Sequence, residues 1–73
     1  MGKMDDARRH AKQIEYYYHH AGESGYRQAV YHWNELCELA RRSHKNDTPV
    51  IEGIRQSVKH MIDEMKQKEK CSD

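Results

Sequence analysis

Apolar residues recur at helical spacing in three stretches of the chain. The central stretch, residues 26–42, is the longest uninterrupted amphipathic segment and contains the only Trp. Each of its apolar residues has another one three or four positions further along or back, which is the spacing of one helical face. They are Tyr26, Ala29, Val30, Trp33, Leu36, Cys37 and Ala40. On a helix they cover an arc of about 120°, which suits packing against two neighbouring helices.

The flanking stretches repeat this pattern. The N-terminal one predicts a helix from Met4 to Ala21 on the stripe Met4, Ala7, Ala11, Ile14, Tyr18 and Ala21. The C-terminal one predicts a helix from Pro49 to about Lys68 on the stripe Ile51, Ile54, Val58, Met61 and Met65, with Val50 and Ile62 at its edges. Both stripes alternate between steps of three and four residues, so each predicts one buried helical face.

Two short polar segments separate the three stretches. Gly22 can end the first helix, because glycine tolerates the left-handed conformation of a helix end, and Ser24 or Gly25 can cap the second. After residues 44–47, Thr48 is the expected N-cap and Pro49 the first residue of the last helix. Connections this short make consecutive helices antiparallel neighbours.

We therefore predict an all-α fold, an antiparallel three-helix bundle with helices at about residues 4–21, 26–43 and 49–68. Residues 1–3 are expected to be a disordered leader and residues 69–73 a frayed tail. A chain of 73 residues is one domain, with room for a thin core and none for an enclosed cavity.

Composition and charge exclude several function classes. The net charge of +1 provides no general attraction to nucleic acid or to an anionic membrane. No apolar run approaches the ~20 residues of a membrane span, and the N-terminus has no apolar signal region. The two cysteines do not indicate a disulfide framework. These features predict a soluble, cytoplasmic chain, and we expect a monomer rather than a homo-oligomer.

Catalytic and metal-binding patterns are missing from the sequence. The six histidines form no pair at helical spacing, and neither HExxH nor CxxC occurs. Cys37 lies on the apolar face of its helix and is interpreted as a small buried hydrophobic residue. No Ser-His-Asp or Cys-His arrangement is indicated. We expect no enzymatic activity, no cofactor and no metal site.

The last helix and the hairpin before it resemble MIT domains, the microtubule-interacting and trafficking fold. The last helix of that family commonly has Ile-Arg, then an apolar residue, then an apolar pair followed by Asp. Here these are Ile54-Arg55, Val58, Met61-Ile62 and Asp63. The Gly25-Tyr26 pair, followed by Ala29 and Trp33, is similar to the family's hairpin and to a tetratricopeptide-type unit. MIT domains are three-helix bundles of about this length, so the resemblance covers nearly the whole chain.

The resemblance implies a non-enzymatic, peptide-binding adaptor. MIT domains bind short motifs of ESCRT filament subunits and commonly belong to proteins of membrane trafficking or microtubule severing. One binding mode places a partner helix between helices two and three, and another places an extended segment between helices one and three. Both use a groove along helix three, so the expected partner is a protein segment and not nucleic acid.

The resemblance also implies particular site residues. Ile62 matches the apolar residue that lines the groove between helices two and three, and the family's acidic residue four positions later is Lys66 here. That departure puts the family's usual preference for basic motifs in doubt. Leu39 lies off the apolar stripe of its helix. The expected groove consists of His32, Leu36, Leu39, Ile62, Met65 and Lys66, and the expected second groove, between helices one and three, includes His10 and Tyr17.

Other interpretations of the sequence stay open at this point. Leu39 can be an ordinary exposed apolar residue. Tyr18 can be a core residue of its helix, Tyr17 a boundary residue and Tyr16 a surface residue. The chain can also be a small free-standing homo-oligomeric accessory protein of prokaryotic or phage type. In that case the apolar stripes of its first and third helices would pack between copies of the chain. A nucleic-acid-binding helical domain is the third alternative. It would need polar base-reading residues on a recognition helix, and the third stretch has an apolar face with mixed charge instead.

Overall fold

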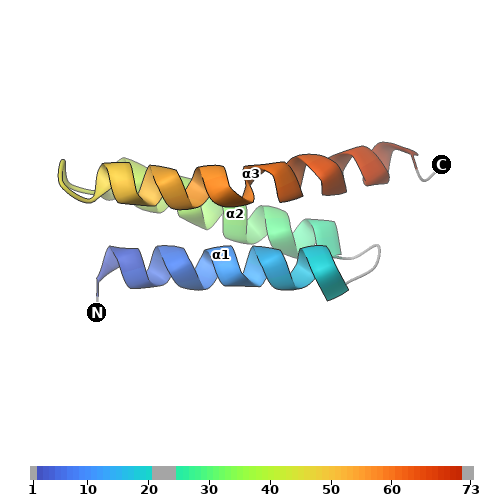
Figure 1. Ribbon diagram of the computed structural model, residues 1–73, viewed down its shortest axis with the longest axis horizontal. Coiled ribbons are helices and arrows are strands. Elements are labelled where there is room, and N and C mark those ends of the chain that lie inside the picture. The colour runs from blue at the N-terminus through green and yellow to red at the C-terminus, as the bar shows by residue number, and fades with distance from the viewer. Residues whose placement is uncertain (1, 21–24, 72–73) are drawn as a thin grey trace.

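Three helices pack side by side along one axis. The computed structural model describes residues 2–20 and 25–71, which form α1 (Lys3–His20), α2 (Gly25–Arg42) and α3 (Thr48–Cys71). The chain runs along α1, returns along α2 and runs along α3 in the same direction as α1 (Figure 1). Each helix contacts both of the others, which confirms the predicted antiparallel three-helix bundle. The molecule measures 43 × 18 × 15 Å.

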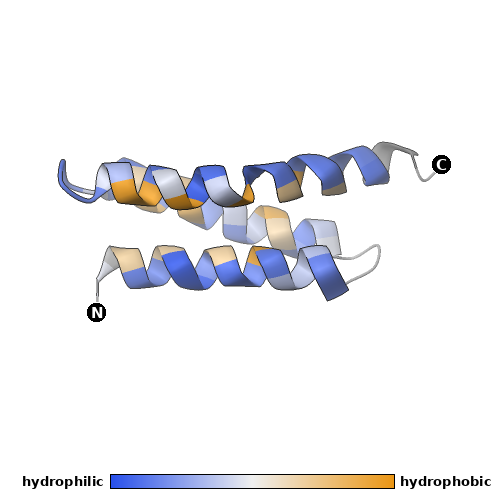
Figure 2. Cartoon of the chain, viewed as in Figure 1, coloured by the Kyte–Doolittle hydropathy of each residue, from blue (hydrophilic) through white to orange (hydrophobic). Residues whose placement is uncertain are grey.

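The core is entirely aliphatic among the described residues. None of the buried residues is polar or charged, and orange ribbon segments turn toward the space between the helices (Figure 2). The buried side chains are those of Ala7, Ala11, Ile14, Ala29, Leu36, Ala40, Ile51, Val58, Ile62 and Met65. Nine of these ten lie on the predicted stripes, because a helix buries the face on which its apolar residues repeat.

Ile62 is the exception. The sequence places it at the edge of the α3 stripe, yet it is only 8% exposed and belongs to the core, whereas Ile54 and Met61 are only partly buried. The α3 face that points inward is therefore rotated from the predicted centre toward Ile62. The rotation arises because α3 must cover both α1 and α2, and the two helices together set the direction of its buried face.

The helix ends differ slightly from the predicted ones. The amides of Asp5 and Asp6 donate to the Gly2 carbonyl at 3.1 and 3.3 Å, so α1 already includes Lys3 of the predicted leader. Helix α3 continues to Cys71, three residues beyond the predicted end. The residues predicted to end the first helix and cap the second, Ala21, Gly22 and Ser24, lie outside the described residues.

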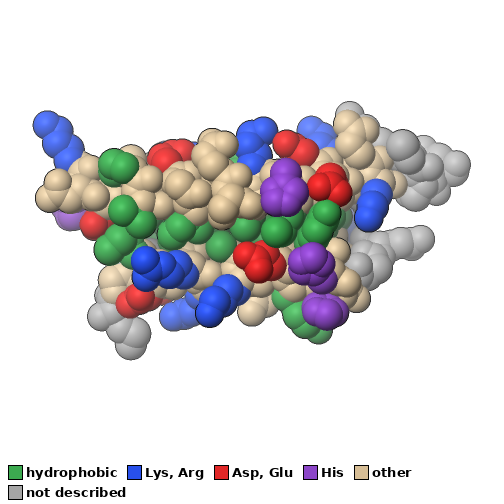
Figure 3. Space-filling view, in the orientation of Figure 1, with side chains coloured by type: hydrophobic (Ala, Val, Ile, Leu, Met, Phe, Trp, Pro, Cys, Tyr) green, Lys and Arg blue, Asp and Glu red, His purple; other side chains and the backbone are tan. Residues whose placement is uncertain are grey.

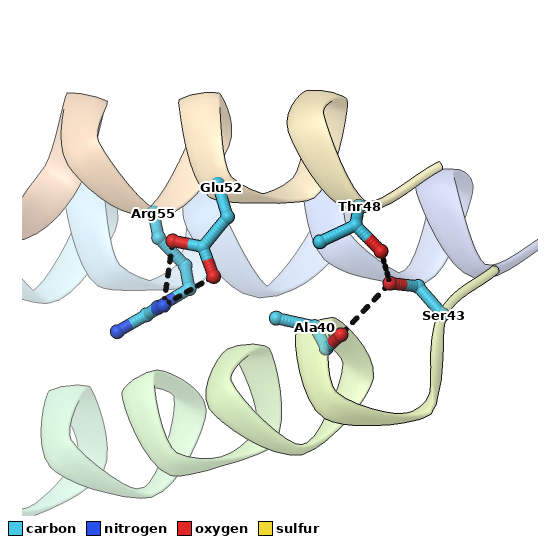
Figure 4. Close-up of polar contacts among 5 residues, drawn as sticks. All are labelled: Ala40, Ser43, Thr48, Glu52 and Arg55. Atoms are coloured by element: carbon cyan, nitrogen blue, oxygen red, sulfur yellow. Dashed lines mark hydrogen bonds and ion pairs between the residues drawn. The ribbon is translucent and has the colours of Figure 1, made fainter. Parts of the chain in front are cut away.

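The turn between α2 and α3 is held by hydroxyl groups (Figure 4). The hydroxyls of Ser43 and Thr48 contact each other, with the Ala40 carbonyl oxygen 2.8 Å from Ser43 Oγ and the His44 carbonyl oxygen 2.9 Å from Thr48 Oγ1 as the other acceptors within reach. The Asp47 carbonyl accepts the first helical bond, from the Ile51 amide at 3.0 Å. The predicted N-cap is therefore wrong by one residue: Asp47 takes that position, and the Thr48 side chain ties α3 back to the turn.

Candidate functional site

The α1–α2 side of the bundle holds a cluster of rings. His10 Nδ1 and His32 Nδ1 lie 2.8 Å apart, and the Tyr17 ring stacks on His32 with centroids at 6.2 Å and planes at 20°. His10 and Tyr17 were expected in a groove between α1 and α3, and His32 in one between α2 and α3. All three meet between α1 and α2 instead, so both assignments are corrected. Leu39, seven residues after His32, lies on the same side of α2 and packs partly buried against the core.

The rest of the predicted α2–α3 groove is mostly core. Leu36 is fully buried, and Ile62 and Met65 are each 8% exposed, so their side chains fill the bundle rather than line its surface. Lys66 is exposed on α3. The six predicted groove residues therefore do not form one surface. A contiguous apolar stripe read from sequence cannot distinguish core from groove, because both require the same residue types at the same spacing.

The α2–α3 surface is instead covered by Arg55. Its guanidinium carbon lies 5.1 Å from the centre of the Trp33 ring, a cation–π contact between α3 and α2. Arg55 Nη1 donates to both carboxylate oxygens of Glu52 at 2.7 Å (Figure 4). Only 23% of the Arg55 side chain is exposed. This arrangement closes the middle of the α2–α3 surface over the indole ring.

Replacing Arg55 by Ala should uncover Trp33. We expect the melting temperature to fall by ~4–8 °C, which corresponds to about 1 kcal/mol in a domain of this size, and the Trp33 fluorescence to shift to longer wavelength. Thermal unfolding and emission spectra measure both effects. The matched variant Arg55→Met keeps the aliphatic part of the side chain and should retain most of the stability. Unchanged emission in Arg55→Ala would show that Arg55 does not cover the indole.

The α1–α3 surface is apolar, and among the described residues no cation–π contact like that of Arg55 and Trp33 covers it. Tyr18 of α1 donates its hydroxyl hydrogen to Glu64 Oε1 of α3 at 2.8 Å, and this contact fixes which edges of the two helices face each other. Positions at steps of three and four residues from Tyr18 and Glu64 lie on the same edges. They include the core residue Ala11 and the hydrophobic residues Met4, Val50, Ile54 and Met61, which are not fully buried. We refer to the last four residues as the α1–α3 groove.

Most of the α1–α3 groove is accessible from outside. Val50 is 40% exposed, and Met4, Ile54 and Met61 are partly buried. Figure 3 shows a band of hydrophobic side chains running between α1 and α3 over much of their length. From Val50 to Met61 the helical rise spans about 16 Å. The groove therefore has the length of two to three turns of a partner helix, or of about five extended residues.

The two rims of the groove differ in charge. Arg8 and Lys12 are exposed along α1, and neither forms an ion pair with any described residue. In Figure 3, basic side chains lie beside the hydrophobic band over the N-terminal half of α1, and an acidic side chain lies beside it further along the helix. The α3 rim carries the small, uncharged residues Gly53 and Ser57, both exposed. A Cβ atom added at Gly53 would meet no neighbouring atom outside the helix backbone within 4 Å, so the surface is open there.

The Tyr18–Glu64 pair bounds the groove at its far end. The hydrogen bond to Glu64 raises the pKa of the Tyr18 hydroxyl, and burial and the Glu64 charge raise it further. The His60 ring lies edge-on to Tyr18, with centroids 6.2 Å apart. These contacts bridge α1 and α3 in one place and leave the stretch from Met4 and Val50 to Met61 open.

The described residues offer neither a metal-binding cluster nor a membrane-spanning helix. No group of three or more His, Cys, Asp or Glu side chains among residues 2–20 and 25–71 is placed to hold a metal ion. Within the same ranges, no helix is sufficiently long and apolar to cross a membrane. Cys37 is half-buried and not in the core, where the sequence placed it, because it lies at the α3-facing margin of α2 beside Trp33.

Comparison of the chain with family models, with curated proteins and with solved structures found no match in any of the three. The assignment of function therefore depends on the geometry of the bundle and on the sequence resemblance described above.

The sequence did not predict the Trp33–Arg55 contact, and although it predicted a second groove between helices one and three, it assigned none of the residues of the α1–α3 groove to it. The groove residues lie on two stripes that the sequence shows separately. Only the rotation of each helix decides which stripe members are buried and which stay at the edge. One feature of the sequence could have indicated the groove. When Ile62 is counted in the apolar face of α3, Met4, Ile54 and Met61 lie at the margins of their stripes, where side chains are only partly buried.

Proposed function

We propose that this chain is a non-enzymatic peptide-binding adaptor module of MIT type and that its binding surface is the α1–α3 groove. The observation that supports this proposal is the band of accessible hydrophobic side chains between two parallel helices, next to a basic rim on one side. Apolar anchors in a groove combined with charges on its rim are the usual requirements for recognising a short peptide. Of the two grooves along helix three that the sequence left open, the proposal selects the one between α1 and α3, because Arg55 covers the α2–α3 surface.

The groove favours a peptide with apolar anchors and acidic neighbours. Two or three aliphatic side chains would occupy the space along Met4, Ile54 and Met61. An acidic side chain would meet Arg8 and Lys12, which have no ion-pair partner among the described residues. MIT domains often have an acidic residue four positions after the one that matches Ile62, where this chain has Lys66. The basic rim proposed here has the opposite charge to that acidic residue. On the MIT resemblance, the partner is a protein of ESCRT-type trafficking in the cytoplasm, and the peptide carries a more acidic motif than usual.

A negative charge introduced in the groove or on its basic rim should weaken peptide binding. Val50→Glu and Arg8→Glu should each weaken a peptide with apolar anchors and acidic residues by at least ~10-fold, equivalent to 1.4 kcal/mol. Val50 is 40% exposed and Arg8 is exposed, so both variants should keep the helical circular dichroism of the parent. Titration of labelled chain with synthetic peptides, followed by backbone amide shifts, measures affinity and location together.

The matched control is Arg27→Glu, which reverses an exposed charge on the outer side of α2. It should bind like the parent. Equal weakening by Arg27→Glu would indicate a general charge effect, and unchanged binding of Val50→Glu would remove the groove assignment. Light scattering at two well-separated concentrations distinguishes self-association: a dimer that Val50→Glu dissociates would mean that a second copy of the chain occupies the groove.

A further inference from the structure

The side chains of His10 on α1 and His32 on α2 meet directly between the two helices. Their Nδ1 atoms lie 2.8 Å apart and their ring centroids 5.0 Å apart, with planes tilted by 43°. Both side chains are partly buried. At this separation the two nitrogens must share one hydrogen, because one ring donates its N–H and the other accepts it through a lone pair.

The chemistry of imidazole limits how many protons this contact can hold. With both rings neutral, or with one of them protonated, one Nδ1 lone pair remains to accept the hydrogen bond. With both rings protonated, each Nδ1 carries a hydrogen and no acceptor is left. Two positive charges and two facing N–H groups would then repel each other at 2.8 Å. The second proton can bind only if the rings separate.

The surroundings of His32 oppose its protonation more than they favour it. Burial lowers the pKa of His32, the proximity of His10 lowers it further, and the Glu35 carboxylate on the same helix acts in the opposite direction. The uncharged rings of Tyr17 and Tyr31 cover His32 from α1 and α2, with centroids at 6.2 and 5.1 Å.

The other charged and titratable groups near the pair do not neutralise it. Asp6 lies one turn before His10 on α1 and is already ion-paired with Arg9 at 3.4 Å. No described α3 side chain hydrogen-bonds to or stacks on either histidine ring. Among the described residues, Glu35 is therefore the carboxylate near His32 that is not held in an ion pair and could partly offset a second positive charge.

We propose that the His10–His32 contact is a pH-sensitive latch that holds α1 on α2 at neutral pH and opens when both rings are protonated. The direction follows from linkage: a histidine kept neutral by the fold contributes stability above its unfolded pKa of about 6.5, and this stability is lost as the pH falls through that value. Opening would part Tyr17 from His32 and loosen the packing between α1 and α2. The latch is a property of the fold alone and does not depend on the proposed groove.

Thermal unfolding at pH 7.5 and pH 5.0 tests the latch without any ligand. The melting temperature of the parent should fall by ~5 °C more than that of the double variant His10→Gln/His32→Gln, whose amide side chains cannot be protonated in this range. His44→Gln, at an exposed position in the α2–α3 turn, is the matched control and should show the full parental fall. An equal fall in the parent and the double variant would overturn the proposal.

A second measurement does not depend on overall stability. In the parent, the nuclear Overhauser contact between the Tyr17 and His32 rings should be present at pH 7.5 and lost at pH 5.0. In the single variant His10→Gln it should persist at pH 5.0, because His32 then faces no second imidazolium. Persistence of this contact in the parent at pH 5.0 would show that the rings stay together when protonated and would exclude the latch.

Discussion

Replacing Ile62 by Asp should unfold most of the protein. The change removes a side chain that is 8% exposed from an aliphatic core and places a carboxylate there without any buried polar partner among the described residues. Losing the apolar contacts and burying the acid should together cost about 4 kcal/mol or more. A domain of 73 residues is stabilised by only roughly 4–11 kcal/mol in total. Far-UV circular dichroism at 25 °C and urea unfolding measure the loss of helix and of stability.

The matched control for Ile62→Asp is Lys66→Asp, which introduces the same carboxylate one turn later at an exposed position. It should stay folded. The result also bears on function, because the sequence resemblance assigned Ile62 to a binding groove in which Asp would abolish binding and leave the fold intact. An Ile62→Asp protein with the parental stability in urea would support that surface role and contradict the core position described here.

Leu36→Ala should destabilise the protein more than Leu39→Ala, the change at its other leucine. Leu36 is fully buried at the centre of the bundle, and truncation of such a side chain typically costs 2–5 kcal/mol because the remaining cavity collapses only in part. Leu39, one turn later on α2, undergoes the same chemical change at a partly buried position and should lose less than half as much. Urea unfolding of both variants measures the difference.

This pair of leucines tests the rotation of α2. Equal losses for Leu36→Ala and Leu39→Ala would mean that α2 presents both residues to the core equally, and the assignment of Leu39 to the α1-facing edge would be wrong. A larger loss for Leu39→Ala would reverse the assignment. The slope of the unfolding transition should stay unchanged in both variants, because neither alters the size of the surface exposed on unfolding.

The amino-acid sequence alone determined the fold class and most of the core. Stripes such as Ala7–Ala11–Ile14 and Ile51–Val58–Met65 repeat with the helical period, and this periodicity is a local property that any packing partner must respect. The breaks around Gly22 and Pro49 likewise divided the chain correctly, to within a few residues at the helix ends. The antiparallel order follows from the short connections between the helices.

Only the tertiary structure decided what lies at the edges of those stripes. Ile62 and Met61 are neighbours on α3, and the rotation of α3 against both other helices makes the first core and leaves the second in an open groove. His10 and His32 are twenty-two residues apart, so no periodicity in either helix predicts that their nitrogens meet. The sequence assigned Arg55 no contact beyond its place in the Ile54-Arg55 pair, whereas in the bundle it covers Trp33. In each case the deciding quantity is the angle of one helix relative to another, which depends on how all three pack together and not on local sequence.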